Sequence, residues 1–434
     1  MEPCYFCIDL KSFYASVECV ERGLDPMRAR LVVADPERGE RTICLAVSPA
    51  LKKMGVPGRC RIYEIPKNIS YIQAPPRMQL YLDYSAEIYG VYLKYIARED
   101  IHVYSVDEVF LDVAPYLHMY RLSPRQLAER IRGDVLKTTG IPAACGIGTN
   151  LYLAKIALDI VAKKSPDFLG ELNEEQFQKT LWDHRPLTDF WRIGPGISAR
   201  LRSRGLETMR QVAAAPPELL RELLGVDGDI LKDHARGWEP TRIADIKAYH
   251  SQRRSFCSGQ VLPRDYAVVQ GEVVLREMAD ELCSQMAENG LETQSVTLRL
   301  YAGDRSAPPM YGSQRLMRRT ASRREVVEAF VRLYRRLVSP SVLLRRLYLT
   351  VNDLLPEGSE QLSLFENSDT SIREKNEMQT LLQIRQRFGK NAVLRGTDFL
   401  EGATRRERNA QIGGHKSGLQ RHLDGETYEE KRAR

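Results

Sequence analysis

The first 165 residues alternate short apolar runs with stretches in which apolar residues recur every three or four positions. Continuous or alternating apolar runs predict strands, and the longer period predicts amphipathic helices. The predicted elements are strands within 1–14 and at 31–34, 42–47, 101–113 and 143–148, and helices at 12–22, 49–54, 77–97, 124–138 and 151–163. This order predicts an α+β core in which an antiparallel sheet carries helices on one face.

The rest of the chain divides into a helical region, a polar segment and a second mixed region. Residues 171–240 predict helices joined by Gly and Pro turns, and residues 241–252 predict a polar linker. Residues 253–352 predict a small unit of strands and two amphipathic helices. Beyond residue 352 the chain becomes polar, which predicts mobility after residue 402, although residues 378–388 could form a helix.

Two adjacent carboxylates, Asp107 and Glu108, interrupt the β-forming run 103–111. Ionised acids are costly to bury unless they are paired or bind a cation, and both reach one ion only if the backbone turns there. Asp9 ends another apolar run and supplies a third acid. Such oxygen ligands suit Mg²⁺ held between a protein and substrate phosphates. From these residues alone, a hairpin with solvated acids at its tip explains the pattern equally well.

The charge of the chain is unevenly distributed. The net charge is +7, and residues 241–352 alone hold 18 Lys and Arg against 11 Asp and Glu, an excess of 18 − 11 = 7. Most of these cations are arginines, which match phosphate in a bidentate way and mildly favour a nucleic-acid partner over a solvated helix face.

The cysteines and the apolar runs indicate in which cellular compartment the protein is expected. Cys4 and Cys7 lie on an apolar strand without a further Cys or His pair nearby, which predicts core thiols and a reducing cytoplasm. No apolar run is long enough to span a membrane, and the chain does not start with a signal-peptide pattern.

The segment 190–201 has the pattern of a helix–hairpin–helix turn. Gly194 and Gly196 flank Pro195, and backbone N–H groups at such a turn can hold a phosphate. Glycine turns also join many ordinary helix pairs, so the nucleic-acid interpretation depends on the surrounding arginines, Arg192, Arg200, Arg202 and Arg204.

Together these features resemble the Y-family translesion DNA polymerases, most closely the UmuC-like (ImpB/MucB/SamB-type) branch of bacteria. The matching motifs are IDLKSFYASVE at 8–18, YSVDE at 104–108, GIG with LAKIA within 146–157, and the hairpin at 193–197. The resemblance implies an α+β right hand with a ferredoxin-like palm, small fingers, a helical helix–hairpin–helix thumb and an α+β little finger. The implied bounds are palm 1–14 and 72–168, fingers 15–71, thumb 169–240, linker 241–252, little finger 253–352 and tail 353–434.

The resemblance implies a template-directed DNA polymerase that acts on damaged templates in an SOS-type response, with primer–template DNA and dNTP as substrates. It assigns two Mg²⁺ ions, which in such enzymes lie roughly 3.5–4 Å apart and stabilise the attacking and leaving oxygens. Asp9 and Asp107 are expected to bridge both ions and Glu108 to hold the ion at the primer hydroxyl. The Leu10 carbonyl is expected to complete the coordination of the ion on the triphosphate side.

The aromatic pair after this strand has implied roles in nucleotide binding. Tyr14 takes the position of the steric gate, a ring under the sugar that excludes a 2′-hydroxyl, and a core tyrosine is the alternative. Phe13 is a further nucleotide-binding candidate, although its position favours the core.

Cations and a polar residue are implied for the triphosphate. Lys52 and Lys163 align with cations on the incoming triphosphate, and the neighbouring Lys53 or Lys164 can replace them. The chain departs from its relatives at Ala46 and Ser48, where they carry triphosphate-contacting Thr or Arg and Asn. Only Ser48 keeps a hydrogen-bonding group, which puts nucleotide affinity and fidelity in doubt.

DNA and clamp contacts complete the implied sites. The DNA-binding candidates are Gly194, Gly196, Arg253, Arg254, Arg318 and Arg319. The peptide QLSLF resembles the pentapeptide by which bacterial polymerases bind the sliding clamp, with Gln361 as hydrogen-bonding residue and Leu362, Leu364 and Phe365 as apolar anchors. A strand that packs on the little finger is the alternative. A monomer is expected, and the need for an accessory UmuD-like subunit stays open.

Two other classes of function compete with the polymerase. A non-catalytic DNA-binding accessory would keep the fold, but it has no need for three carboxylates near phosphates. A nucleotide cyclase has a similar palm, but the hairpin, the arginine-rich unit and the clamp peptide serve no small-molecule cyclase.

Overall fold

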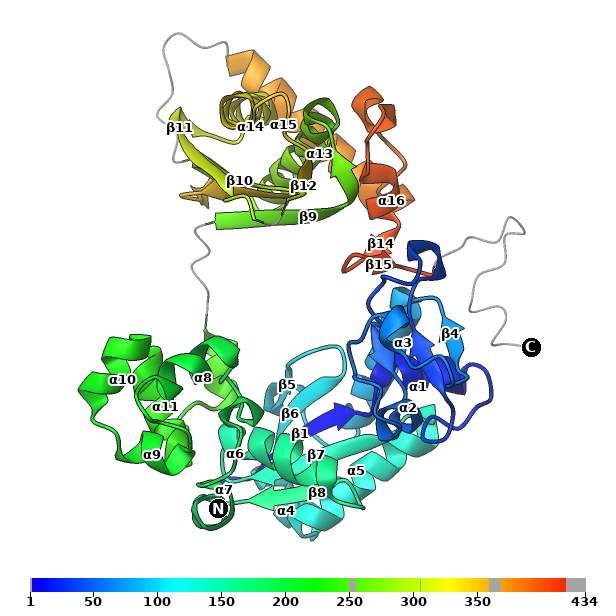
Figure 1. Ribbon diagram of the computed structural model, residues 1–434, viewed down its shortest axis with the longest axis vertical. Coiled ribbons are helices and arrows are strands. Elements are labelled where there is room, and N and C mark those ends of the chain that lie inside the picture. The colour runs from blue at the N-terminus through cyan, green and yellow to red at the C-terminus, as the bar shows by residue number, and fades with distance from the viewer. Residues whose placement is uncertain (1, 250–254, 305, 359–367, 419–434) are drawn as a thin grey trace. The chain divides into compact units, whose positions relative to one another are not determined.

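The computed structural model describes residues 2–249, 255–304, 306–358 and 368–418. The chain divides into two compact units, Met1–His250 with His415–Arg434, and Ser251–Gly414 (Figure 1). Among the helices of the described ranges, none combines the length and apolar composition that crossing a bilayer requires.

A five-stranded sheet in the order β5-β6-β1-β7-β8 forms the centre of the first unit, and we call it the palm sheet. Its strands are β1 (Tyr5–Leu10), β5 (Ile101–Val103), β6 (Glu108–Asp112), β7 (Ala143–Gly148) and β8 (Leu169–Leu172). The central strand β1 pairs antiparallel with β6 and β7, whereas β8 runs parallel to β7. The acids of the sequence motifs therefore lie on the two strands at the middle of the sheet.

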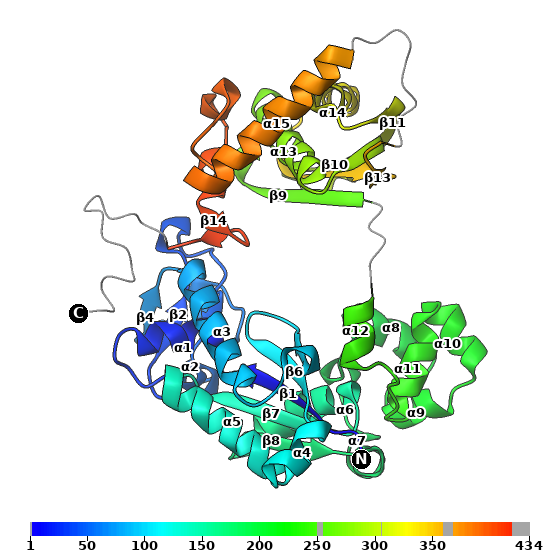
Figure 2. The same cartoon turned by 180° about the vertical axis from the view of Figure 1, so that it is seen from behind.

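Helices cover both faces of the palm sheet, although the sequence predicted helices on one face only. The helix α6 (Leu151–Ile156) packs on the face that carries Tyr5 and Cys7. On the opposite face Phe6 and Ile8 are also fully buried. Helices α3 (Met78–Leu93) and α5 (Pro124–Thr139) contact each other, and α5 contacts β7 (Figure 2). A strand that is apolar on both sides needs cover on both sides, which the continuous apolar run 4–8 already reflects.

A small insertion with its own sheet, which we call the fingers, lies between β1 and α3 in the chain. It contains α1 (Phe13–Val20), the three-stranded sheet β3-β2-β4, and α2 (Pro49–Lys53). The strands are β2 (Leu31–Val33), β3 (Ala46–Val47) and β4 (Ile72–Ala74). A separate apolar core that includes Val32, Val47 and Leu51 holds the insertion together.

Residues 174–235 form a helical subdomain, as the sequence predicted. Its helices are α7 (Glu174–Leu181), α8 (Pro195–Arg202), α9 (Met209–Ala214), α10 (Pro217–Leu224) and α11 (Asp227–Ala235). Phe177, Phe190 and Leu201 are buried in its core. The predicted linker is partly helical, because α12 (Ile243–Ala248) buries Ile243 against the palm core.

The second unit is an antiparallel sheet, β11-β10-β12-β9, with helices on one face. The elements are β9 (Ser255–Tyr266), α13 (Val268–Glu288), β10 (Leu291–Ala302), β11 (Met310–Thr320), α14 (Arg323–Leu337), β12 (Leu344–Asn352) and β13 (Leu355–Pro356). Val296, Leu298 and Leu300 of β10 point to the helices and are fully buried. The residues between them, Thr297 and Arg299, therefore point to the other face.

Residues 368–414 fold onto this second unit, so the described part of the chain after residue 402 differs from the mobility predicted there. They contain α15 (Ser368–Phe388), the 3₁₀ turn η7 (Gly396–Phe399), α16 (Arg405–Asn409) and β14 (Gln411–Ile412), and β15 (His415–Lys416) follows in the first unit. Met378 and Leu382 of α15 pack against the apolar core of the second unit.

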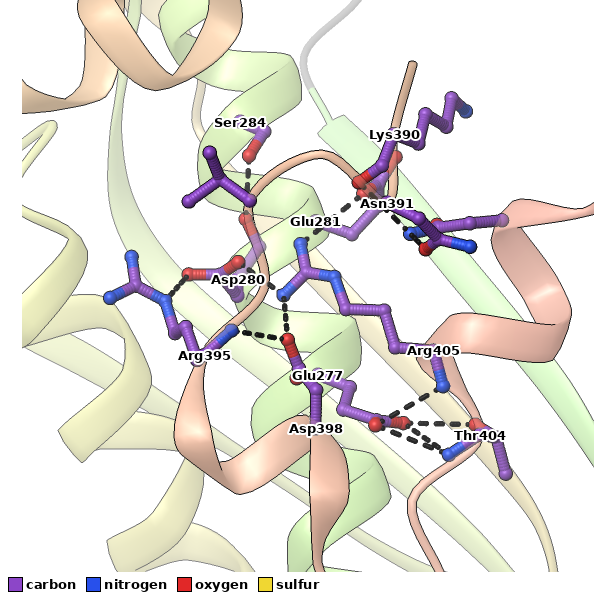
Figure 3. Close-up of polar contacts among 12 residues, drawn as sticks. Glu277, Asp280, Glu281, Ser284, Lys390, Asn391, Arg395, Asp398, Thr404 and Arg405 are labelled. Atoms are coloured by element: carbon purple, nitrogen blue, oxygen red, sulfur yellow. Dashed lines mark hydrogen bonds and ion pairs between the residues drawn. The ribbon is translucent and has the colours of Figure 1, made fainter. Parts of the chain in front are cut away.

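A buried network of charges joins this segment to α13 (Figure 3). Asp280 is 1% exposed and pairs with Arg395 at 2.9 Å and with Arg405, which is 4% exposed. Glu277 accepts hydrogen bonds from the backbone N–H groups of Thr404 and Arg405. Composition predicted mobility because the segment is polar, whereas its charges are used in contacts with α13.

Candidate active site

The palm sheet brings Asp9 and Glu108 together as direct cross-strand partners on β1 and β6. Side chains of such partners project from the same face of a sheet at neighbouring positions. Asp107 precedes β6 in the turn after β5, where its carbonyl accepts from the Leu10 N–H at 3.0 Å. The turn expected from the adjacent acids is therefore present, and it places Asp107 and Leu10 beside this pair.

Two lysines of the helix after β7 contact these acids. The Nζ of Lys155 lies 2.7 Å from Oε1 of Glu108, and the Nζ of Lys163 lies 3.0 Å from Oδ2 of Asp9. The Cys7 thiol donates to the same Glu108 at 3.2 Å. Lys163 was expected near the triphosphate, but Lys155 was missed as a site residue, although it stands in the LAKIA motif that carried the resemblance.

Burial raises the pKa of both carboxylates. Desolvation raises the pKa of Asp9 against the opposing charge of Lys163, and it raises the pKa of Glu108 against that of Lys155. The charge of Asp107 also raises the pKa of Asp9, and the charge of Asp9 raises the pKa of Glu108. Crowded, partly buried acids of this kind bind a cation favourably, since it replaces the lost hydration.

The donor set has the chemistry that hard divalent cations require. Three carboxylates and one backbone carbonyl supply oxygen ligands at strand ends. Within the described ranges, no three His, Cys, Asp or Glu side chains converge closely enough to hold a metal as they stand. The carboxylates contact lysines instead, and Asp107 accepts from the Ser105 hydroxyl at 2.8 Å. The residues fit a cation by donor type, after the side chains turn toward a common point.

Tyr14 lies at the start of α1, next to the acids. Its ring stacks on Tyr81 with centroids 4.6 Å apart, and desolvation and then the charge of Asp107 raise its pKa. The Tyr81 hydroxyl donates to the buried Glu18 at 2.7 Å, which fixes the ring under Tyr14. Phe13 is 2% exposed and belongs to the core. Tyr81 was missed, because only the fold brings α3 under α1.

Of the residues expected at the triphosphate, Lys52 lies near the acids and Ser48 does not. Desolvation lowers the pKa of Lys52, and the charges of Asp9, Lys163 and Asp107 act on the same ammonium, so Lys52 shares the environment of the acids. Ser48 is fully buried, and its hydroxyl accepts from the Leu31 N–H at 3.1 Å. The structure therefore gives the Ser48 side chain a contact within the fingers and does not bring it to the acids.

The hairpin candidates lie at an exposed helix start. Gly194 precedes α8, Pro195 is its first residue, and Gly196 follows. A Cβ at Gly194 or Gly196 would meet nothing within 4 Å, so the approach to these backbone N–H groups is open.

The candidates in the second unit differ in availability. Arg318 pairs with Glu325 at 2.7 Å, and Arg319 donates to Gln294 at 3.1 Å. Arg253 and Arg254, like Gln361, Leu362, Leu364 and Phe365 of the clamp peptide, lie outside the described residues.

The sheet face of the second unit carries arginines and tyrosines that were not among the DNA-binding candidates expected from the sequence. Arg299 stacks on Tyr311 with 5.2 Å to the ring centroid, and Arg346 lies 5.9 Å from the ring of Tyr301. Tyr301 in turn contacts Tyr348. Alternation with the buried leucines of β10 and β12 was the signal that could have found them.

Comparisons with known proteins agree with this geometry. Residues 8–159 match the impB/mucB/samB family and residues 253–364 match the impB/mucB/samB family C-terminal domain. The chain is 30% identical to the "Putative UV-damage repair protein UvrX" of Bacillus subtilis, over 95% of this chain and 97% of that protein. It is also 30% identical to "DNA polymerase IV 2" of Halalkalibacterium halodurans, over 96% and 100%.

A solved structure supports the fold. The "Y-family DNA polymerase chimera Dbh-Dpo4(243-245)-Dbh" superposes with a TM-score of 0.62 at 18% identity, over 82% of this chain and all of that one. Asp9, Asp107 and Glu108 lie within the first family match, and both relatives align with nearly the whole chain. The chain therefore belongs to the impB/mucB/samB family, the UmuC-like branch of the Y-family DNA polymerases.

Proposed function

We propose that this DNA-directed DNA polymerase copies damaged templates by two-cation nucleotidyl transfer, with Mg²⁺ held by Asp9, Asp107, Glu108 and the Leu10 carbonyl. The observation that carries the proposal is the cross-strand pair of Asp9 and Glu108, with Asp107 in the adjoining turn. The lysines that pair with these partly buried acids offset only part of their desolvation, because the pKa values of Asp9 and Glu108 stay raised. A divalent cation offsets both their desolvation and their mutual repulsion.

The cations would lower the pKa of the primer 3′-hydroxyl and neutralise charge on the α-phosphate and the leaving pyrophosphate. Asp9, Asp107 and Glu108 would hold them, and no side chain needs to act as a nucleophile. Lys163 and Lys52 carry positive charge beside Asp9, where they can bind triphosphate oxygens. The Tyr14 ring, supported by Tyr81, lies beside Asp107 and would leave no room for a 2′-hydroxyl.

DNA binding is proposed for two surfaces, each within its own unit. The open N-terminus of α8 can hold a backbone phosphate through its N–H groups. The arginines on the sheet face of the second unit suit phosphate contacts, which carry affinity without reading sequence. Small fingers and backbone-directed contacts support error-prone synthesis past lesions, and the relative named a UV-damage repair protein supports a role in a damage response.

The primary test is primer extension on undamaged template with Mg²⁺ and dNTPs. We expect wild type to extend and Asp107→Ala to fail, while both bind primer–template equally. Asp183→Ala is the matched control, because Asp183 pairs with Arg210 on the surface. Equal extension by wild type and Asp107→Ala would reject the assignment. Failure of both, with DNA binding intact, would favour a non-catalytic accessory or a missing subunit of the UmuD-like kind.

We also propose that the peptide around Gln361 binds the bacterial sliding clamp. Gln361→Ala with Phe365→Ala removes the hydrogen bond and one apolar anchor, so extension in the presence of the loaded clamp should become as short as extension without it. Extension without the clamp should stay at the level of wild type. Clamp-stimulated extension that survives the double substitution would remove this part of the proposal.

A further inference from the structure

Asp159 links the two lysines of the candidate active site to each other. Its Oδ2 lies 3.1 Å from the Nζ of Lys155, and its Oδ1 lies 2.7 Å from the Nζ of Lys163. Because Lys155 also pairs with Glu108 and Lys163 with Asp9, a continuous line of alternating charges runs from one site acid to the other. Asp159 stands at its centre and gives one oxygen to each lysine.

The helix geometry around Asp159 produces this arrangement. Lys155, Asp159 and Lys163 are spaced four residues apart, and in a regular α-helix the first and third would diverge by roughly 80°. Here α6 ends at Ile156 and continues as the π turn η4 (Ala157–Val161), then as the 3₁₀ turn η5 (Ala162–Lys164). The π turn takes up an extra residue, so all three side chains meet on one face.

The burial of the group separates it from an ordinary surface pair. The side chains of Lys155 and Asp159 are 8% and 23% exposed, whereas the i,i+4 pair of Glu175 and Lys179 on α7 is about 70% exposed on both sides. A solvated pair of this kind adds little to the stability of a helix. An ammonium as buried as that of Lys155 needs a carboxylate partner at all times.

We propose that Asp159 is a positioning residue that lets Asp9 and Glu108 bind divalent cations, because it keeps both lysines paired when these acids turn to a cation. This inference rests on the proposed function. Without Asp159, the carboxylate partner of Lys155 would be Glu108 and that of Lys163 would be Asp9. Each lysine would then compete with the cation for that acid. With Asp159, both ammoniums stay paired and within reach of the substrate phosphates.

The test measures cation binding separately from catalysis. Asp159→Asn keeps the shape of the side chain and removes its charge. We expect its dissociation constant for Mn²⁺, measured from free Mn²⁺ by electron paramagnetic resonance without nucleotide or DNA, to rise about tenfold over wild type. The Mg²⁺ concentration for half-maximal extension should rise by the same factor, with kcat at saturating Mg²⁺ within about threefold of wild type.

Two further variants identify the cause. Asp159→Glu restores the charge and should recover most of the Mn²⁺ affinity. Glu175→Gln removes one charge from the exposed pair on α7 and should bind Mn²⁺ as wild type does. A purely structural role would lower the melting temperature of Asp159→Asn and leave its Mn²⁺ affinity unchanged.

The outcomes separate this inference from the proposed function. Equal Mn²⁺ affinity of folded wild type and Asp159→Asn would overturn the role of Asp159, even if wild type extends primers. Weaker binding by Asp159→Asn supports the role, even if a missing subunit prevents extension. Wild type that binds no Mn²⁺ would overturn both.

Discussion

At the scale of single residues, the candidate active site combines carboxylates whose burial costs free energy with lysines that reduce this cost. Asp9 lies near the end of β1 and Glu108 at the start of β6, and desolvation raises the pKa of both above the ordinary values. Lys155 and Lys163 offset part of this penalty by pairing with them. The remaining penalty is consistent with a site that is built for a ligand more than for stability.

The first residue-scale prediction concerns the stability of Glu108→Gln. Because the folded state raises the pKa of Glu108, it holds its proton more tightly than the unfolded state, and the ionised group destabilises the fold at neutral pH. Without divalent cations, Glu108→Gln should therefore be about 1 kcal/mol more stable than wild type at pH 7 and inactive in extension. Urea denaturation checks this, and the difference should close as the pH falls below the ordinary pKa of 4.5.

The contrary result for Glu108→Gln would be informative. A variant that is less stable than wild type at pH 7 would mean that the pair with Lys155 outweighs the desolvation of Glu108.

The second residue-scale prediction concerns sugar selection. Tyr14→Ala removes the ring that stacks on Tyr81, which should raise incorporation of ribonucleotides relative to deoxyribonucleotides by about 100-fold. Single-nucleotide incorporation with paired rNTP and dNTP measures the ratio. Tyr63→Ala is the matched control, since Tyr63 is an exposed tyrosine of the fingers, and it should leave the ratio unchanged. An unchanged ratio in Tyr14→Ala would move the gate to another residue.

At the scale of elements, glycines of β7 set the distance between the palm sheet and the helix that carries the lysines. A Cβ at Gly146 would lie 2.1 Å from the carbonyl oxygen of Ala154, and one at Gly148 would lie 2.2 Å from the Ala154 nitrogen. The backbone of α6 thus touches the strand directly. This close approach is what allows Lys155, one residue further along, to reach Glu108 across the sheet.

Replacement of Gly146 should therefore be costly. Gly146→Ala forces α6 away from β7, which should destabilise the first unit by at least about 3 kcal/mol and weaken extension. Gly133→Ala is the control, because Gly133 lies within α5 with open space around it and should become about 0.5–1 kcal/mol more stable. Thermal unfolding compares the two, and equal stability of both variants would contradict the close-packing argument.

At the scale of the whole molecule, the chain forms two units, each with its own core, and residues 368–414 contribute to the second. Four arginines converge on the one carboxylate of Asp280: Arg323 of α14, Arg385 of α15, Arg395 just before η7, and Arg405 of α16. Together with the burial of Met378, this makes the segment part of the fold of the second unit. The bounds 253–352 expected for the little finger therefore leave out chain that the second unit contains.

This organisation predicts an acid-sensitive contact. The arginines hold the pKa of Asp280 at about 2 in the folded state against 3.8 ordinarily, despite its desolvation. The charged form therefore contributes about 2 kcal/mol of stability above pH 4, which is lost as the pH falls from 3.8 toward 2. Asp280→Asn should destabilise the second unit by about 3 kcal/mol at pH 7, since it leaves buried arginines unpaired.

Denaturation of Asp280→Asn and wild type between pH 7 and pH 2 measures the effect. The difference between them should narrow below pH 4, and Glu288→Gln, at an exposed position of the same helix, should match wild type throughout. A difference that is independent of pH would mean that shape rather than charge holds the segment in place.

Much of the molecule was predictable from neighbouring residues alone. The strand around Asp9, the strand with Glu108 and the helix with Lys155 follow from local apolar patterns, which depend on residues close in sequence. The motifs around Asp9 and Asp107 identified the family, which the comparisons confirmed. The local pattern failed where charged residues were expected to be exposed to water, as in the described residues after 402.

The sequence by itself determined the family and the acids proposed for the chemistry, because motif and periodicity are local properties. Only the tertiary structure decided how they are paired, since Asp9 and Glu108 meet through a strand register between segments about 100 residues apart. The same holds for Tyr81 under Tyr14 and for Arg405 at Asp280. A polar residue has the same local pattern whether water or a distant buried charge is its partner, and only the packing of the chain selects between them.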